Sequence, residues 1–558
     1  MGRETQPFVL IVGGGQGGLA LGARLRQLQV PTLIVDQHPR VGDQWRSRYA
    51  SLCLHDPVWY DHLPYLPFPD TWPVYTPKDK IGDWLEAYAQ AMELLVWCST
   101  RCVSAVYDAE AGRWTVTLRR GEETSVIRPA HLVLATGNAG KPRVPRFKGQ
   151  AQFEGPILHS SAYRSGADFK GRRVAVIGSN NSAHDICADL VAHGVDVTMI
   201  QRSSTHVVRS ETVMRTMLAP LYSEEALAAG IGTELADLLV ASMPLRLQAE
   251  GYRALHVAIA EQDAAFYAAL EAIGFMHDFG EDGTGMPLKY LRRASGYYID
   301  VGASELLASG AIKLRSRVEI DHFDTDGLAL SDGSKVDADA VICATGFGSM
   351  DEWAAELISP EVAAKVGRVW GYGSGTRGDP GPWEGELRNM WKPTRQQGLW
   401  FQGGNLAQTR FYSRALALQL KPDMLIAVSL RSSPTRRRRS SLILLRGVPE
   451  AHARLSLVYC FANLRPQLEM FGQERPAIGD AHGQGLFVVV LGDRTVLDKR
   501  DRQNRIDDLD VRVKLLLRIA QKRHVEDAVK ALIGRASDGF HIFAIGLPCL
   551  EPAKSTQE

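Results

Sequence analysis

The stretch FVLIVGGGQGGLALGARLRQLQVPTLIVD, residues 8–36, decides the fold. An apolar run leads into Gly13, Gly15 and Gly18 at G-x-G-x-x-G spacing, a helical pattern follows, and a second β-branched run ends on Asp36. Such glycines serve the tight turn, the close approach of a pyrophosphate and the packing of helix on strand, in that order. Asp36 stands where a carboxylate bonds a ribose hydroxyl. The stretch therefore predicts a dinucleotide-binding unit.

Composition limits the class of protein. A chain of 558 residues with 45% apolar content predicts two or three domains with large cores. A net charge of +1 gives no reason to expect nucleic acid or an anionic membrane as partner. Seven cysteines without zinc spacing favour a reduced, cytoplasmic protein without a metal site. No apolar stretch is long enough to predict a membrane-spanning helix.

The pattern of the first unit starts again at residue 173. A strand at 173–177 leads into the turn GSNNSA at 178–183, and a helix and another strand follow. Each copy continues with a hairpin and then a strand that ends in Ala-Thr-Gly, at 135–137 and at 344–346. The repeated order predicts an internal duplication of a whole nucleotide-binding unit.

The second copy is longer than the first. It runs from Gly178 to Ala344, which is 44 residues more than the span from Gly13 to Ala135. We place this excess in a helical stretch at 211–290.

The second turn departs from the glycine fingerprint. Asn180 stands at the middle glycine position and Ala183 at the third, where alanine is an accepted variant. Asparagine tolerates left-handed dihedrals better than other non-glycine residues, so the turn is expected to survive. Its Cβ is expected to limit how closely a phosphate approaches.

The two copies differ in charge after their second strands. The second strand of the first copy ends on Asp36. The second strand of the second copy leads into QRSST, which contains Arg202 and Ser203. A carboxylate repels a 2′-phosphate, while a guanidinium and hydroxyls bind it. The first copy therefore suits FAD and the second suits NADPH. Arg202 could alternatively be a solvated surface charge.

A linker motif and six further segments carry a family resemblance. Residues 153–163 read FEGPILHSSAY, or F-x-G-x-x-x-H-x-x-x-Y, with His159 at the histidine. Together with the two turns, GDQWRSRY at 42–49, ATGN and ATGF, and the segment 398–421, they make the chain resemble the flavin-containing monooxygenases. Baeyer–Villiger enzymes usually end the linker motif in Trp-Pro or Trp-Asp.

The resemblance implies an α/β fold with two interleaved Rossmann-like domains on parallel sheets. The expected FAD domain covers 1–165 and 336–421, and the NADPH domain covers 166–335 with its helical insert. Residues 422–558 form a tail outside the resemblance, with RRRR at 436–439 and one helical pattern from about 508 to 532. The tail could be an appended domain, a disordered charged segment or the product of a reading-frame slip.

The resemblance also implies the reaction and its residues. NADPH would reduce FAD, O₂ would add as a C4a-hydroperoxyflavin, and one oxygen would pass to an N-, S- or carbonyl centre of a small substrate. His159, Asn138 and Asn405 are the catalytic candidates; His159 could equally be a linker histidine bonded to backbone. The cofactor-binding candidates are Gly13, Gly15, Gly18, Asp36, Gln44, Trp45, Arg46, Thr136, Gly137, Gly178, Asn180, Asn181, Ser182, Ala183, Arg202, Ser203, Thr345 and Gly346.

Three other functions compete with this one. A disulfide reductase needs a redox cysteine pair beside the flavin, and Cys98 and Cys102 have the wrong spacing. A Baeyer–Villiger or 2-oxo-acid decarboxylating monooxygenase, of the indole-3-pyruvate type, shares all the cofactor chemistry and stays open. A non-catalytic NADPH- and FAD-binding sensor is favoured only if the Asn180 turn fails to hold nucleotide.

Overall fold

The computed structural model describes residues 6–69, 71–137, 140–371 and 387–421, and the backbone of strands β19 (Phe487–Gly492) and β20 (Phe540–Ile545). The chain divides into two units, Met1–Val448 and Pro449–Glu558. In the second unit β19 and β20 pair in antiparallel fashion. The arginine run at 436–439 and the helix expected at 508–532 lie outside the described residues.

The first sheet of unit 1 has five parallel strands in the order β18-β7-β1-β2-β3. Their bounds are Leu399–Phe401, His131–Leu134, Val9–Val12, Thr32–Val35 and Val96–Trp97. The strands are short apolar runs because helices or loops cover both faces of a parallel sheet. The sheet joins residues near 10 to residues near 400, so this domain is discontinuous in sequence.

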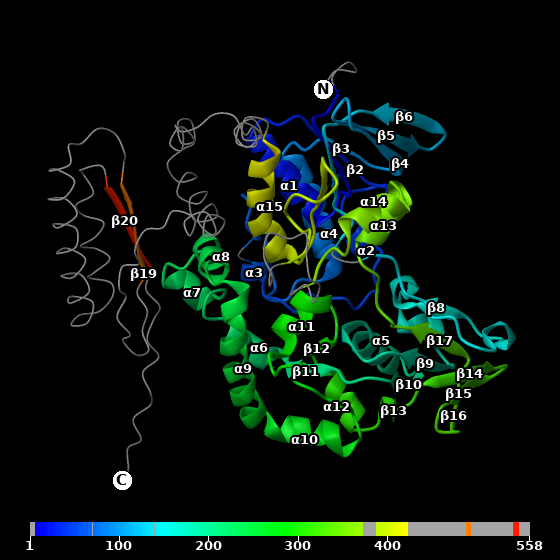
Figure 1. Ribbon diagram of the computed structural model, residues 1–558. Helices are drawn as coiled ribbons and strands as arrows, with labels where there is room; N and C mark the ends of the chain where they lie inside the picture. Colours follow the sequence, from blue (N-terminus) through cyan, green and yellow to red (C-terminus); the bar gives the residue numbers. More distant parts are fainter. Residues whose placement is uncertain are drawn as a thin grey trace, which may run out of the picture. The chain divides into compact units, whose positions relative to one another are not determined.

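Two helices cover this sheet and meet each other. Helix α1 (Gln16–Gln27) follows the first glycine turn, and α15 (Leu406–Leu420) is the last described helix of unit 1. Figure 1 shows the yellow α15 beside the blue α1. The first domain also contains α2 (Asp43–Arg46), α3 (Val58–Asp61), α4 (Lys78–Ala91), α13 (Asp351–Leu357) and α14 (Pro360–Val366).

The second sheet repeats this arrangement with the order β13-β10-β9-β17-β8, again all parallel. Its strands are Lys313–Ser316, Asp196–Gln201, Arg173–Ile177, Ala340–Cys343 and Ile157–His159. Helix α5 (Asn181–Ala192) follows the second turn, and α12 (Ala303–Ala308) lies later in the domain. The two parallel sheets confirm the α/β fold class. Strands β8 and β17 extend the second sheet beyond both ends of the expected 166–335 range.

Each copy also carries a three-stranded antiparallel sheet. The first consists of β4 (Arg101–Asp108), β5 (Arg113–Arg120) and β6 (Glu123–Ile127). The second consists of β14 (Ile320–Asp324), β15 (Gly327–Leu330) and β16 (Lys335–Asp337). Both precede the strand that ends in Ala-Thr-Gly, which is the order that the sequence duplication predicts.

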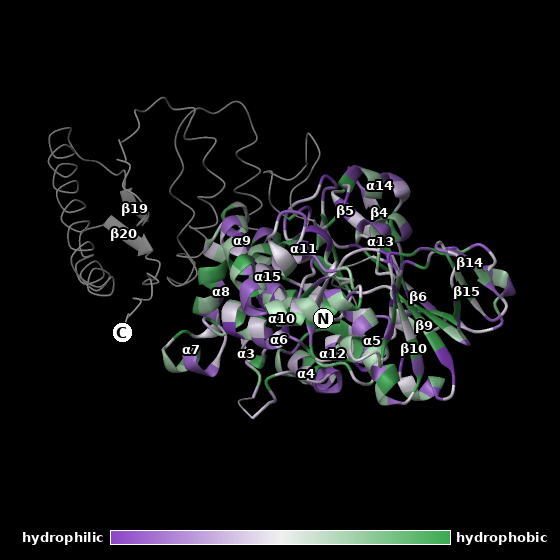
Figure 2. Ribbon diagram, turned by 90° about the horizontal axis from the view of Figure 1, so that it is seen from below, coloured by the Kyte–Doolittle hydropathy of each residue, from purple (hydrophilic) through white to green (hydrophobic). Residues whose placement is uncertain are grey.

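Helices fill the chain between β11 (His206–Arg209) and β12 (Tyr297–Asp300), which pair in parallel. They are α6 (Ser210–Val213), a π-helical turn (Met214–Leu218), α7 (Glu224–Ala228), α8 (Thr233–Ser242), α9 (Leu245–Gln262), α10 (Ala264–Ala272) and α11 (Gly285–Arg293). Figure 2 shows hydrophobic residues on the outer turns of α8, where Leu235 and Val240 are 47% and 45% exposed. Within the described residues, none of the helices has the length and apolar content to cross a bilayer.

Candidate functional site

Both glycine turns close against the Ala-Thr-Gly segment of their own copy. A Cβ on Gly13 would lie 2.3 Å from the Ala135 carbonyl oxygen, and one on Gly178 would lie 2.5 Å from that of Ala344. Both glycines have left-handed φ, +115° and +124°. A side chain at this position of either turn is therefore disfavoured for two reasons. The backbone conformation is left-handed, and a Cβ would collide with a carbonyl oxygen. The duplication thus extends to atomic contacts.

The middle position of the first turn faces a side chain and no backbone atom. Gly15 is extended, with φ −80° and ψ −172°, and a Cβ there would meet the Gln44 side chain, 3.1 Å from Nε2. The Nε2 and Oε1 atoms of Gln44 are buried without a hydrogen-bond partner. Trp45 donates from Nε1 to Gln16 Oε1 over 3.1 Å, which holds this segment on the first turn of α1. The N-terminus of α1 and Gln44 together form a cradle with unused polar atoms.

Asp36 lies at the end of β2 and bonds the glycine turn directly. Its carboxylate accepts from the Gly14 N–H over 2.6 Å and from the His38 N–H over 2.8 Å, while His38 Nδ1 lies 2.7 Å away. Burial raises the pKa of Asp36, but the hydrogen bonds from His38 and Gly14 outweigh it and the net shift is downward. The carboxylate is therefore ionised at neutral pH and can accept from a ribose hydroxyl.

Arg46, one of the cofactor-binding candidates, takes part in an ion-pair network. Its guanidinium donates to Asp43, Asp83 and Glu86 over 2.8–3.0 Å, and also to the Val41 carbonyl. This network links α2 to α4. Gln44 and Trp45, two and one residues earlier, are the members of this segment that face the first turn.

The carboxyl ends of β7 and β18 line the other side of the cradle. Thr136 Oγ1 and both amide atoms of Gln402 are buried without a partner. A Cβ on Gly17 would lie 3.3 Å from the Gln402 carbonyl oxygen, so Gln402 adjoins the start of α1. A Cβ on Gly403 would lie 2.3 Å from the carbonyl oxygen of Gly137, the neighbour of Thr136. Asn138 lies outside the described residues.

Asn405 is the N-cap of α15 and joins three parts of unit 1. It forms a capping box with Gln408, whose N–H donates to Asn405 Oδ1 over 2.8 Å. The Asn405 amide donates from Nδ2 to the Tyr60 hydroxyl over 3.2 Å, and its backbone N–H donates to the Tyr290 hydroxyl over 3.2 Å. Tyr60 and Tyr290 were not among the residues expected from sequence, and they bring α3 and α11 to this point.

The second turn has the same backbone as the first. Asn180 is extended, with φ −97° and ψ −170°, close to the values of Gly15. The expectation that left-handed tolerance explains this asparagine is therefore wrong, because any residue adopts this backbone. Its side chain has a partner of its own: the Thr205 hydroxyl donates to Asn180 Oδ1 over 3.2 Å and lies 2.8 Å from Ser179 Oγ.

The rest of the second turn starts α5. Asn181 accepts at Oδ1 from the Ile299 N–H over 3.1 Å, which ties the turn to β12. Ser182 is half-buried, and Ala183 is fully buried at the third glycine position. The second copy thus accommodates a methyl group at this position. The first copy does not, because a Cβ added to Gly18 would lie 1.9 Å from the Gly13 carbonyl oxygen.

Arg202 and Ser203 are exposed directly after β10. Arg202 forms no ion pair or hydrogen bond within the part of the chain that the structure describes. Its guanidinium is thus available at the carboxyl end of the strand that follows the second turn, where a 2′-phosphate is bound in dinucleotide folds.

An Arg202→Ala variant is expected to raise the Michaelis constant for NADPH about tenfold to a hundredfold, because one charge-assisted phosphate contact is lost. The constant for NADH, which lacks the phosphate, should stay nearly unchanged. Steady-state oxidation of both coenzymes measures this. Arg119→Ala, at an exposed arginine of β5, is the matched control. An equal increase of the Michaelis constants for NADPH and NADH would show that Arg202 supports the fold and does not bind the phosphate.

His159 connects the linker motif to the second Ala-Thr-Gly segment. Its Nδ1 accepts from the Ser161 N–H over 3.1 Å, so the proton is assigned to Nε2, which donates to the Gly346 carbonyl over 3.0 Å. Burial lowers the pKa of His159, which keeps the ring neutral. Thr345 donates from Oγ1 to the Arg143 carbonyl. His159 is thus a positioning residue for the segment that closes the second turn.

The first cradle fits FAD. The turn Gly13–Gly18 and the α1 N-terminus would hold a pyrophosphate, Asp36 would hold a ribose, and Gln44, Thr136 and Gln402 offer unused polar atoms. The second cradle fits NADPH through Gly178, the start of α5 and the free Arg202 guanidinium. The described cysteines are all unpaired, and burial raises the pKa of Cys102 to about 12, so this thiol has no thiolate character.

The comparisons with known proteins agree with this geometry. A family profile described as pyridine nucleotide-disulphide oxidoreductase matches residues 10–241. An indole-3-pyruvate monooxygenase of rice (Oryza sativa subsp. japonica) is 32% identical over 375 residues, which is 65% of this chain and 84% of the relative. A probable indole-3-pyruvate monooxygenase of Arabidopsis thaliana is 30% identical, over 61% of this chain and 75% of the relative.

Two solved structures share the fold. Cyclohexanone monooxygenase, in an open crystal structure, has a TM-score of 0.52 at 17% identity and covers 82% of this chain and 93% of its own. An oxidized steroid monooxygenase bound to NADP has a TM-score of 0.52 at 21% identity, over 76% of this chain and 87% of its own. The paired nucleotide cradles and the extent of the match to the rice enzyme show that this chain belongs to the flavin-containing monooxygenase family and is an oxidoreductase that uses FAD and NADPH.

Proposed function

We propose that this monooxygenase oxygenates an aryl 2-oxo acid with loss of CO₂. The observation that carries the proposal is the match to relatives described as indole-3-pyruvate monooxygenases, which extends over 375 residues and 84% of the rice relative. The linker motif supports it, because the motif ends in Tyr163 and lacks the Trp-Pro or Trp-Asp ending of Baeyer–Villiger enzymes. The oxygenated centre would be the ketone carbon next to the carboxylate.

The reaction balances without a further reactant. One 2-oxo acid, one O₂, one NADPH and one proton give the acid shortened by one carbon, one CO₂, one water and NADP⁺. One oxygen atom of O₂ enters the new carboxylate and the other enters water. Bound FAD supplies hydride acceptance from NADPH and the activation of O₂.

The residues of this chain would hold and orient the reactants. Asp36, Gln44 and the first turn hold the flavin nucleotide, while Arg202 and the second turn hold the nicotinamide coenzyme. His159 fixes Gly346 and thereby the segment against which the second turn closes. Asn405 keeps the Tyr60 and Tyr290 hydroxyls together at the N-terminus of α15.

A substrate panel tests this proposal on the purified holoenzyme. Indole-3-pyruvate and phenylpyruvate are expected to stimulate NADPH oxidation and to release one CO₂ per NADPH consumed. Cyclohexanone and N,N-dimethylaniline serve as the ketone and amine comparisons, and each should give little product. Conversion of cyclohexanone to its lactone, with no CO₂ from either 2-oxo acid, would contradict the proposal and favour Baeyer–Villiger chemistry.

We also propose that the protein works in the cytoplasm. The unpaired state of Cys53, Cys98, Cys102, Cys187 and Cys343 supports this, because disulfides are rare in reducing compartments.

A further inference from the structure

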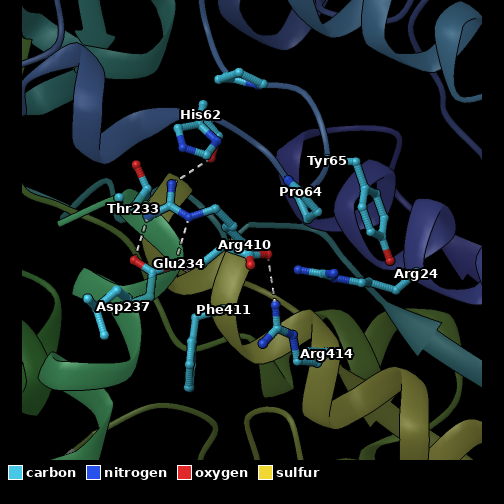
Figure 3. Close-up of a pocket in the computed structure, with 13 residues that line it drawn as sticks. Arg24, His62, Pro64, Tyr65, Thr233, Glu234, Asp237, Arg410, Phe411 and Arg414 are labelled. Carbon is cyan, nitrogen blue, oxygen red and sulfur yellow. Dashed lines mark hydrogen bonds and ion pairs between the residues drawn. The ribbon is translucent and has the colours of Figure 1, made fainter. Parts of the chain in front are cut away.

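A cavity lies along α15, away from the nucleotide cradles. Its volume is about 480 Å³, and Figure 3 shows side chains of α1, α8, α15 and the 62–67 segment around it. The cavity residues Arg410 and Arg414 come five and nine positions after Asn405, about 7 and 13 Å along the helix axis. None of Gln44, Thr136, Gln402 and Asn405 lines it. Its volume is in the range of small-molecule sites.

Arg24 is the unusual residue in this cavity. The residue is 6% exposed, its Nε is buried without a hydrogen-bond partner, and within the described residues it forms no ion pair. Its guanidinium carbon lies 4.5 Å from the centre of the Tyr65 ring, and Figure 3 shows the group directed into the opening. Tyr65 itself has a left-handed φ of +72°, which a bulky side chain rarely adopts. Burying an unpaired cation is costly, so a site that does so calls for a counter-charge.

The other charged groups of the cavity do not supply that counter-charge. Asp237 is already paired with Arg410 through two hydrogen bonds of 2.7 and 2.8 Å. Glu234 accepts from Arg414 over 3.2 Å, but its side chain is 79% exposed. His62 is neutral at pH 7, because burial and the Arg410 charge lower its pKa to about 4.

Arg414 adds a second cation with unused donor capacity. Its Nε is also buried without a partner, and its side chain is only 18% exposed. Burial and then the charge of Arg24 lower the pKa of Arg414, which reflects how close the two cations are. Three arginines against two carboxylates leave the lining one positive charge in excess. Pro64, Pro67, Leu235 and Phe411 make the rest of the wall apolar.

We propose that this cavity binds a small organic carboxylate with an apolar body, whose carboxylate lies between Arg24 and Arg414. Guanidinium groups match carboxylates in planar, bidentate geometry, and one excess positive charge matches a monoanion. The apolar walls accept the body of the ligand. The inference does not depend on the substrate proposed above, because it needs only the cavity, its charges and its walls.

The test is calorimetric titration of the FAD-loaded protein with 2-naphthoate, which is not a 2-oxo acid, and with its neutral counterpart 2-naphthamide. Naphthoate is expected to bind and naphthamide to bind much more weakly. Arg24→Gln should weaken naphthoate binding about tenfold to a hundredfold, as expected for a lost charge-assisted contact. Arg26→Gln, on the exposed side of α1 and ion-paired with Glu93, is the matched control and should bind as the unchanged protein does.

Flavin content and NADPH oxidation are measured on the same samples, and both should be unaltered in Arg24→Gln, which shows that the variant folds. Three results would each overturn the proposal. These are equal affinity of the Arg24→Gln and unchanged proteins for naphthoate, equal affinity for naphthoate and naphthamide, and no binding at millimolar concentration. Displacement of naphthoate by equimolar inorganic phosphate would overturn the assignment to an apolar carboxylate.

Discussion

A Gly15→Val variant is expected to fold and to contain no flavin. The branched side chain would enter the space between the α1 N-terminus and Gln44, where the pyrophosphate of FAD would lie. The backbone there is extended and the nearest atoms belong to the end of a flexible side chain, so the protein without cofactor tolerates the change. Flavin released on denaturation, measured per mole of protein, should fall to background, and NADPH oxidation should be lost.

The control for this variant is Gly251→Val on α9. It introduces the same side chain at an exposed glycine with open space around its Cβ position, and it should keep full flavin content. Gly18→Val should behave differently from both, because its Cβ would lie 1.9 Å from the Gly13 carbonyl oxygen and the turn itself would break. A soluble Gly15→Val protein with normal flavin stoichiometry would refute the assignment of the first turn.

An Asp237→Ala variant is expected to lose about 3–5 kcal/mol of unfolding free energy. Asp237 and Arg410 are 7% and 3% exposed and are bonded through both carboxylate oxygens, so the change leaves a buried guanidinium without its counter-charge. The same guanidinium also donates to the carbonyls of Tyr60 and His62, which ties α8, α15 and the segment after α3 together. Urea denaturation followed by far-ultraviolet circular dichroism measures the loss.

Glu234→Ala provides the comparison from the same helix. The Glu234 side chain is 79% exposed, and surface ion pairs of this kind contribute little, so its effect should stay within about 0.5 kcal/mol. Replacing both buried partners by apolar residues, as in Asp237→Leu with Arg410→Met, should cost less than Asp237→Ala alone. Equal stability of Asp237→Ala and Glu234→Ala would contradict the role assigned to this ion pair.

Local features explain why the sequence predicts most of the fold. Gly13 is constrained by the end of the adjacent strand, and Gly18 is constrained by Gly13 in the same turn. Both constraints require glycine, so the spacing of the glycines in the sequence predicts the turn. The same holds for the hairpins and for the Ala-Thr-Gly endings, whose repetition shows the duplication. The family resemblance is confirmed by the match to the rice enzyme.

Contacts between distant segments explain what the sequence does not show. Asn405 bonds Tyr60 and Tyr290, which are 345 and 115 residues away, and no periodicity links these positions. The membership of β8 in the second sheet depends on its pairing with β17, again far along the chain. Asn180 shows a different limit, since its residue type suggested a backbone strain that the turn does not have.

The most direct test of the account is oxygen labelling during turnover. The holoenzyme is mixed with NADPH and indole-3-pyruvate under ¹⁸O₂. The product acid is quantified by mass spectrometry, and hydrogen peroxide is quantified by a peroxidase assay. We expect one ¹⁸O atom in the carboxylate of each product molecule, one NADPH consumed per product and little peroxide. Oxidation of NADPH with all the oxygen recovered as hydrogen peroxide, and no label in any organic product, would contradict it.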